Sequence, residues 1–270
     1  MVVGVCLALL TGAASAQGPF RGRGRGRYGA PIRLATPESF DGAFVFCRAA
    51  FRNAPDGDGA GWGVDYPRAD ENLSIRLSEL SKTATSRNPD GSPNHVVVRL
   101  TDPELFECPF VMMTEPGGAF FDEQEAGRLR EYLLKGGFLW VDDFWGEYAF
   151  NHWAREIGKV LPRADYAIED VPLDHALFHT LFDVRRIPQI SSIDFWAGSG
   201  GRTSERGADS ADPHVRAILD RRGRIMVLMT HNTDLGDAFE REGDNREYFY
   251  RFAVDGYALG IDILLYAMSH

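Results

Sequence analysis

Short apolar runs alternate with amphipathic helical patterns along most of the chain, and this alternation constrains the fold more than any other feature. The runs lie at 43–47, 95–100, 109–114 and 138–141. They are typical of strands that are buried on both faces. Leu73, Leu77 and Leu80 share one face of an intervening helix, and a second helix is expected between Asp122 and Lys135. The pattern predicts an α/β three-layer sandwich, a mainly parallel sheet with helices on both faces.

The second half of the chain continues the pattern. A helix is expected at about 146–160, and the runs 215–219 and 225–229 flank a polar turn, which indicates a hairpin. The last helix is expected at about 246–268. Because Asp262 interrupts its apolar sequence, we interpret it as a buried packing helix rather than a membrane span.

The N-terminus reads as an export signal. Residues 2–16 are apolar or small and end in the cleavage pattern Ala14-Ser15-Ala16. This predicts a signal peptide at 1–16, a flexible Arg-Gly-rich tether at 17–40 and a single α/β domain at 41–270. The protein would then be exported, periplasmic or extracellular, without a transmembrane helix after cleavage. No Lys or Arg precedes the apolar run, which a mis-assigned start and a longer true N-terminus would explain. An uncleaved N-terminal anchor is the alternative to export by cleavage.

Charge limits the possible partners. The chain carries 29 Lys+Arg and 39 Asp+Glu, a net charge of −10. The four arginines of the Arg-Gly run at 21–27 leave about −14 for the rest, so we expect no nucleic-acid binding by the folded domain. Signal cleavage would leave Cys47 and Cys108, which permit at most one disulfide.

Charged and aromatic residues follow the predicted strands. In parallel sheets, ligands bind beyond the carboxyl ends of the strands, where the strand order changes direction. We therefore expect one rim with Asp143 and Glu115 as candidate catalytic residues. The candidate ligand-binding residues are Arg48, Trp62, Asp65, Tyr66, Asp142, Trp145, His231, Asp234 and Asp237.

This set of side chains suits two kinds of chemistry. Crowded carboxylates raise one another's pKa, which suits general acid–base catalysis, or they bind a hard cation. Each residue also has a simpler explanation. Asp142 or Asp143 could cap the following helix, Arg48 could pair with one of the acids, and Glu115 could be a turn residue.

Several stretches resemble a known bacterial family. They are Asp65-Tyr66-Pro67, Asn72, Gly136-Gly137-Phe138-Leu139, Asp142-Asp143-Phe144-Trp145-Gly146, Pro188-Gln189 and Gly236-Asp237-Ala238. From Phe44 to the C-terminus the chain resembles the domain-of-unknown-function 4159 family. That family is similar to the class I glutamine amidotransferase-like fold, which is flavodoxin-like, and it has no established activity.

The resemblance also exposes a difference. In amidotransferases the nucleophilic Cys lies on the turn that here reads Val141-Asp142-Asp143-Phe144. We predict that Cys47 closes another strand, and that Cys108 precedes its strand and lies at the opposite rim. Glutamine hydrolysis by a Cys nucleophile is therefore not expected.

Two functions follow from these observations. The first is a non-catalytic binding domain for a polar ligand or envelope partner, with Trp62, Tyr66 and Trp145 as stacking surfaces and no cofactor. The second is a hydrolase of an envelope carbohydrate or peptide that uses Asp143 and Glu115. A divalent cation held by Asp142, Asp143 and Asp234 could assist it. A purely structural envelope role is a third interpretation.

Overall fold

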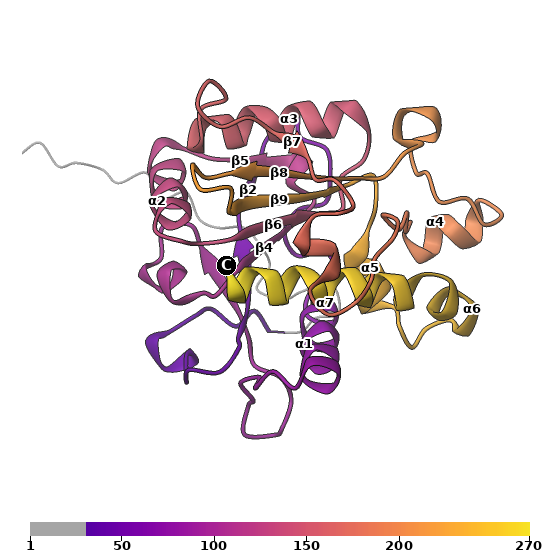
Figure 1. Cartoon of the computed structure of the whole chain (residues 1–270), viewed down its shortest axis with the longest axis horizontal. Helices are drawn as coiled ribbons and strands as arrows, with labels where there is room; N and C mark the ends of the chain where they lie inside the picture. Colours follow the sequence, from indigo (N-terminus) through magenta and orange to yellow (C-terminus); the bar gives the residue numbers. More distant parts are fainter. Residues whose placement is uncertain (1–30) are drawn as a thin grey trace, which may run out of the picture.

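The computed structural model describes residues 31–270, so the predicted signal peptide and residues 17–30 of the tether lie outside the described residues. A seven-stranded sheet runs through the domain in the order β3-β1-β4-β6-β9-β8-β7 (Figure 1). The strands are β1 (Phe46–Ala50), β3 (His95–Arg99), β4 (Val111–Thr114), β6 (Leu139–Asp142), β7 (Glu169–Asp170), β8 (His214–Leu219) and β9 (Ile225–His231). A separate two-stranded sheet pairs β2 (Arg52–Asn53) with β5 (Ala119–Phe120).

The sheet is mainly parallel, as predicted. Strands β3, β1, β4, β6 and β9 pair in parallel, whereas β8 runs antiparallel to β9 and β7 antiparallel to β8. When the five parallel strands are numbered by their order in the chain, their order across the sheet is 2-1-3-4-5. The winding direction therefore reverses between β1 and β4, and a ligand site is expected at the carboxyl ends there.

Helices pack on both faces of the sheet, as also predicted. The helices are α1 (Arg68–Ser81), α2 (Glu123–Leu134), α3 (Gly146–Val160), α4 (Ile193–Gly198), α5 (Leu235–Glu240), α6 (Arg246–Tyr248) and α7 (Val254–Ser269). Helices α1, α5 and α7 cover one face, and α2 and α3 cover the other (Figure 1). Two separate apolar cores result, one on each side of the sheet.

The first strand lies later in the chain than its apolar pattern predicts. It spans Phe46–Ala50 instead of 43–47, so Arg48 lies in mid-strand and not at the strand end. Cys47 is likewise inside the strand and does not close it. Arg48 can occupy the middle of this buried strand because its guanidinium has hydrogen-bond partners inside the protein. In α1, Leu80 is half exposed and does not join the buried face formed by Leu73 and Leu77.

The described part of the predicted tether packs on the domain. The Ala35 N–H donates to the carbonyl of Val97, and the Val97 N–H donates to the carbonyl of Arg33. Residues 33–35 thus extend the sheet beside β3.

The C-terminal helical segment, Arg246–Ser269, is long and apolar enough to cross a membrane. In the structure, however, 61% of its most apolar 18-residue stretch is buried inside the domain. Asp262 accepts hydrogen bonds from the N–H groups of Leu181 and Phe182, so its carboxylate has partners within the domain. The segment occupies the place of a core helix.

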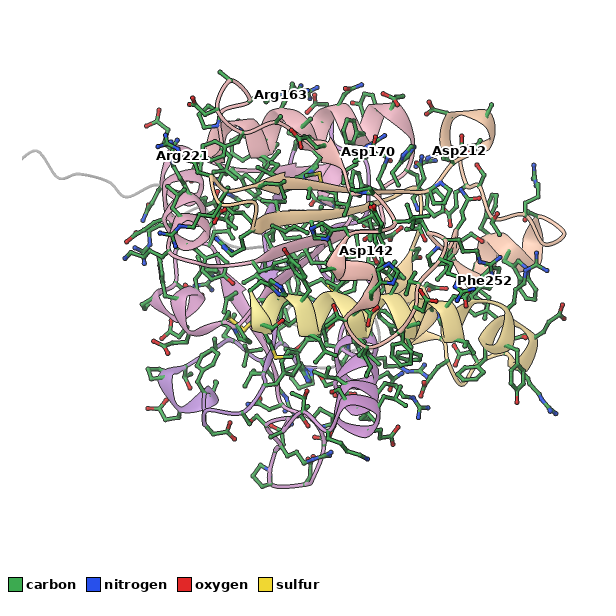
Figure 2. All side chains as sticks on the ribbon, viewed as in Figure 1. Asp142, Arg163, Asp170, Asp212, Arg221 and Phe252 are labelled. Carbon is green, nitrogen blue, oxygen red and sulfur yellow. A yellow bond between two sulfur atoms is a disulfide. The ribbon has the colours of Figure 1, made fainter. Side chains whose placement is uncertain are left out.

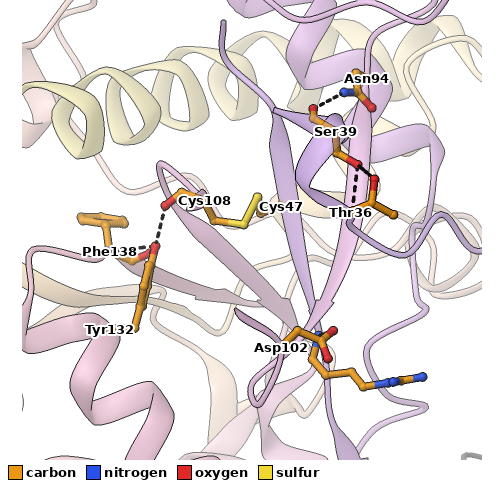
Figure 3. Close-up of a disulfide and its surroundings, with 9 residues drawn as sticks. Thr36, Ser39, Cys47, Asn94, Asp102, Cys108, Tyr132 and Phe138 are labelled. Carbon is orange, nitrogen blue, oxygen red and sulfur yellow. Dashed lines mark hydrogen bonds between the residues drawn. A yellow bond between two sulfur atoms is a disulfide. The ribbon is translucent and has the colours of Figure 1, made fainter. Parts of the chain in front are cut away.

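Cys47 and Cys108 form a disulfide (Figure 3). It joins β1 to the segment before β4. Beside it, the Tyr132 hydroxyl donates to the carbonyls of Cys108 and Phe138 at 3.2 and 3.3 Å. The two cysteines stand 61 residues apart in the chain, so the bond restricts a long loop of the unfolded chain.

We expect the double variant Cys47→Ala/Cys108→Ala to lose about 4 kcal/mol of unfolding free energy, the loop-entropy value for this separation. Urea unfolding measures it. A reductant should destabilise the wild-type protein and leave the variant unchanged. Equal stability of the two proteins would contradict the expectation.

Candidate functional site

A pocket of about 580 Å³ opens at the carboxyl ends of the parallel strands. The loop between β2 and α1 contributes residues 58–60 and 63–65, and Glu115 follows β4. Residues 143–145 follow β6, and Asp234 and Asp237 follow β9. The pocket therefore spans the place where the strand order reverses, as the rule for open α/β sheets requires.

The pocket wall is strongly acidic. Its carboxylates are those of Asp58, Asp65, Glu115, Asp143, Asp194, Glu205, Asp234 and Asp237. Two arginines, Arg206 and Arg241, also line it, and Arg206 pairs with Asp58 at 3.1 Å. The excess of negative charge favours ligands that bring positive charge or hydrogen-bond donors.

Asp65 is one of the residues that line this pocket. Its side chain is fully buried, and neither carboxylate oxygen has a hydrogen-bond partner. Burial, followed by the charges of Asp237 and Glu240, raises the pKa of Asp65 well above its ordinary value. Gly236 makes room for the carboxylate, because a Cβ there would stand 2.3 Å from Asp65 Oδ2.

Asp143 and Asp234 face Asp65. Each offers an oxygen that lies within 4.8 Å of the others and of an Asp65 oxygen. The Trp145 indole N–H donates to Asp143 Oδ1 at 2.8 Å, and the Asp237 N–H donates to Asp234 Oδ1 at 2.6 Å. Burial is the largest cause that raises the pKa of both carboxyls, and the charges of neighbouring acids add to it. Three buried carboxylates thus converge in one place.

Asp237 belongs to a second group of carboxylates, with Asp65 and Glu240, whose oxygens also lie within 4.8 Å of one another. Here a cation is already present. The Arg241 Nε lies 2.7 Å from Glu240 Oε2 and 3.4 Å from Asp237 Oδ1. Asp237 also accepts hydrogen bonds from the Ile193 N–H and the Tyr248 hydroxyl, at 2.6 and 3.1 Å. Burial raises the pKa of Asp237 to about 6.

Glu115 links two loops of the pocket. Its backbone is left-handed, with φ of 52°, and its carboxylate accepts hydrogen bonds from the N–H groups of Ala60 and Gly61. The turn interpretation therefore describes its backbone, while its side chain faces the pocket. Its charge is the second cause, after burial, of the raised pKa of Asp143.

Arg48 does not line the pocket. It is fully buried and forms an ion pair with Asp70, which the sequence analysis did not select. It also donates to the Thr114 hydroxyl at 2.6 Å and to the carbonyl of Val64 at 3.0 Å. The alternative that Arg48 pairs with an acid is thus the arrangement in the structure, although the acid lies in α1.

Asp142 is not among the residues that line the pocket, although Asp143 follows it directly. It is fully buried at the end of β6 (Figure 2) and accepts hydrogen bonds from the Thr230 hydroxyl and the Gly236 N–H. Its carboxylate therefore bonds to β9 and α5 and is not part of the pocket lining. It is not a member of the carboxylate groups described above.

The remaining predicted residues divide in the same way. Trp145 lines the pocket, whereas Trp62, Tyr66 and His231 are not among its lining residues. Tyr66 is fully buried, and Trp62 packs edge-on against it. His231 packs against Phe144 and Phe150. Burial lowers the pKa of His231 to about 4.

Sequence reasoning missed the far wall of the pocket. Asp194, Glu205 and Arg206 lie between β7 and β8, where no strand ends directly before them, so the strand-end rule does not select them. Arg241 had a usable signal, since it lies four residues after Asp237 in a helical stretch and such pairs face each other.

The fold and the site together define an α/β protein with an acidic pocket at the carboxyl edge of a mainly parallel sheet. Residues 51–268 match the model of a family described as a domain of unknown function (DUF4159), and the chain belongs to this family. No curated protein matches the chain.

The burial of Asp142 predicts a pH dependence of stability. Burial raises its pKa to about 7 in the folded protein, against about 4 in an unfolded chain. Between these values the folded state keeps a proton that the unfolded state has released. The free energy of unfolding therefore falls as pH rises from about 4 to about 7, by up to about 4 kcal/mol from this residue.

The Asp142→Asn variant cannot release that proton, so we expect a smaller fall over the same interval. Urea unfolding between pH 4.5 and 7.5 in the presence of EDTA measures it. An identical pH dependence in variant and wild type would show that Asp142 does not titrate as described.

Proposed function

We propose that this protein is an exported, non-catalytic binding domain whose acidic pocket holds a polar ligand or a segment of an envelope partner. The observation that carries the proposal is the convergence of eight carboxylates and two arginines on one pocket at the strand-order reversal. Carboxylates accept strong hydrogen bonds from ammonium and guanidinium groups. A basic peptide segment is therefore the ligand that the wall complements best, and a hydroxyl-rich carbohydrate is the second.

We further propose that the fold is of the class I glutamine amidotransferase-like, flavodoxin-like type. The order of the parallel strands agrees with the flavodoxin-like order. Asp143, with φ of 59°, sits on a sharp turn between β6 and α3. Strained strand-to-helix turns of this kind carry the nucleophile in other α/β enzymes. Here the turn carries an Asp, and Cys47 and Cys108 are joined to each other.

The disulfide also supports the proposed location. Structural disulfides persist in oxidising compartments and are rare in the bacterial cytoplasm. Cys47 and Cys108 are both buried, which suits a permanent bond. An exported protein, periplasmic or extracellular, would keep it.

A hydrolase is the second candidate function. The observation that favours it is the different environment of two pocket carboxyls. The pKa of Asp143 is raised by burial and by the charge of Glu115, whereas two backbone N–H groups hold the Glu115 carboxylate. Such a pair suits a general acid and a general base. Hydrolysis of an envelope oligosaccharide or peptide that the Asp143→Asn variant lacks would favour this function.

Binding is tested with tetralysine and a neutral chitotetraose as probes, by calorimetry in the presence of EDTA. We expect tetralysine to bind, and Asp143→Asn to weaken it about tenfold or more, because a hydrogen bond to a charged group contributes roughly 1.5–3 kcal/mol. Glu107→Gln, an exposed acid before β4 at the other edge of the sheet, is the matched control and should bind as the wild type does. If neither probe binds, or if Asp143→Asn and Glu107→Gln behave alike, the proposed pocket function is wrong.

A further inference from the structure

The carboxylate of Asp65 is buried without a partner that would compensate for its charge. The side chain is fully buried, and both carboxylate oxygens lack a hydrogen-bond partner. A buried ionised carboxylate is costly unless it is paired or coordinates a metal. The nearby Arg48 directs its N–H groups to Asp70, Thr114 and backbone carbonyls instead.

We propose that Asp65, Asp143 and Asp234 together bind one hard divalent cation, such as Ca²⁺ or Mg²⁺. This inference deepens the proposed binding function and rests on the same pocket. The ion would supply the partner that both Asp65 oxygens lack. It would also leave a positive centre at the floor of the pocket, open to oxygen atoms of a polar ligand.

The spacing of the oxygens fits such an ion. One oxygen from each of the three residues lies within 4.8 Å of the other two. Two ligands on opposite sides of Ca²⁺, each about 2.4 Å away, stand about 4.8 Å apart. Mg²⁺, at about 2.1 Å, would draw the oxygens slightly closer and keep several waters.

The identity of the donors sets the class of metal. Asp65, Asp143 and Asp234 offer only carboxylate oxygens, which suit Ca²⁺, Mg²⁺ and Mn²⁺. Zinc sites, in contrast, are typically built from Cys and His. Among the lining residues that the structure describes, none is Cys or His. A preference for Zn²⁺ is therefore not expected.

The neighbouring carboxylate group explains why we place one ion and not two. Asp65, Asp237 and Glu240 form a similar triangle, but the Arg241 guanidinium already lies against Glu240 and Asp237. A metal there would have to displace this cation. Around Asp143 and Asp234 the hydrogen-bond donors are an indole and a backbone N–H, which carry no net charge.

Gly236 offers a second, independent way to test this metal site. Its missing side chain leaves the space that Asp65 Oδ2 fills, at 2.3 Å from where a Cβ would be. Ala at this position would push the Asp65 carboxylate out of place while leaving every carboxylate in the chain intact. Gly127, in α2, has open space around it and provides the matched Gly→Ala control.

The test uses the full chain, stripped with EDTA, and the metal ions alone. We expect saturable 1:1 binding of Ca²⁺ or Mg²⁺ by calorimetry. We also expect the melting temperature to rise by roughly 5–10 °C at 100 times the dissociation constant. Asp65→Asn, Asp234→Asn and Gly236→Ala should each weaken binding at least tenfold, and Gly127→Ala should not. Because Asp65→Asn removes a buried charge, that variant should melt in EDTA no lower than the wild type.

Several results would overturn the proposal. They are no binding of any hard cation, a response to Zn²⁺ only, or binding that survives unchanged in both Asp65→Asn and Asp234→Asn. The tetralysine assay is performed in EDTA, so its outcome does not depend on the metal. If no metal binds but tetralysine does, the metal site is wrong and the proposed function stands. If metal binds but tetralysine does not, the proposed function is wrong and the metal site stands.

Discussion

The buried ion pair of Arg48 and Asp70 fixes the loop on which the pocket depends. Arg48 lies in the middle of β1, pairs with the first turn of α1, and donates to the Thr114 hydroxyl at the end of β4. Its remaining N–H bonds hold the carbonyls of Trp62 and Val64, directly before Asp65. Removing one partner of such a pair typically costs about 3–5 kcal/mol, because the other charge stays buried alone. Arg48, which the sequence suggests as a ligand-binding residue, therefore does not line the pocket. It holds the loop that carries Asp65.

Three residues that line the pocket have unfavourable backbone conformations. Asp65, Glu115 and Asp143 have φ of 63°, 52° and 59°, a left-handed region that non-glycine residues seldom adopt. Each such residue costs on the order of 1–3 kcal/mol and persists only where the surroundings impose it. All three residues line the same pocket. Strained backbone and crowded carboxylates therefore coincide in this pocket.

The sequence predicts the elements well and the site in part. Apolar periodicity predicts α3 over 146–160 and the β8–β9 hairpin, since both depend on local pattern. The strand-end rule brings Asp143, Asp234 and Asp237 to one pocket. It fails for Asp142, whose carboxylate is buried and accepts hydrogen bonds from the Thr230 hydroxyl and the Gly236 N–H. It fails for Arg48, whose partner Asp70 lies 22 residues away with no local signal. The wall from Asp194 to Arg206 is a matter of tertiary packing, which periodicity does not describe.

The proposed role of the buried Asp65 carboxylate is to bind a cation together with Asp143 and Asp234. Anomalous diffraction from crystals of the protein grown with Mn²⁺, which replaces Mg²⁺ and Ca²⁺ at oxygen sites, tests it directly. We expect one strong anomalous peak within about 2.5 Å of oxygens from Asp65, Asp143 and Asp234. A map with no peak among these three residues, with Asp65 protonated and bonded to a neighbour, would contradict it.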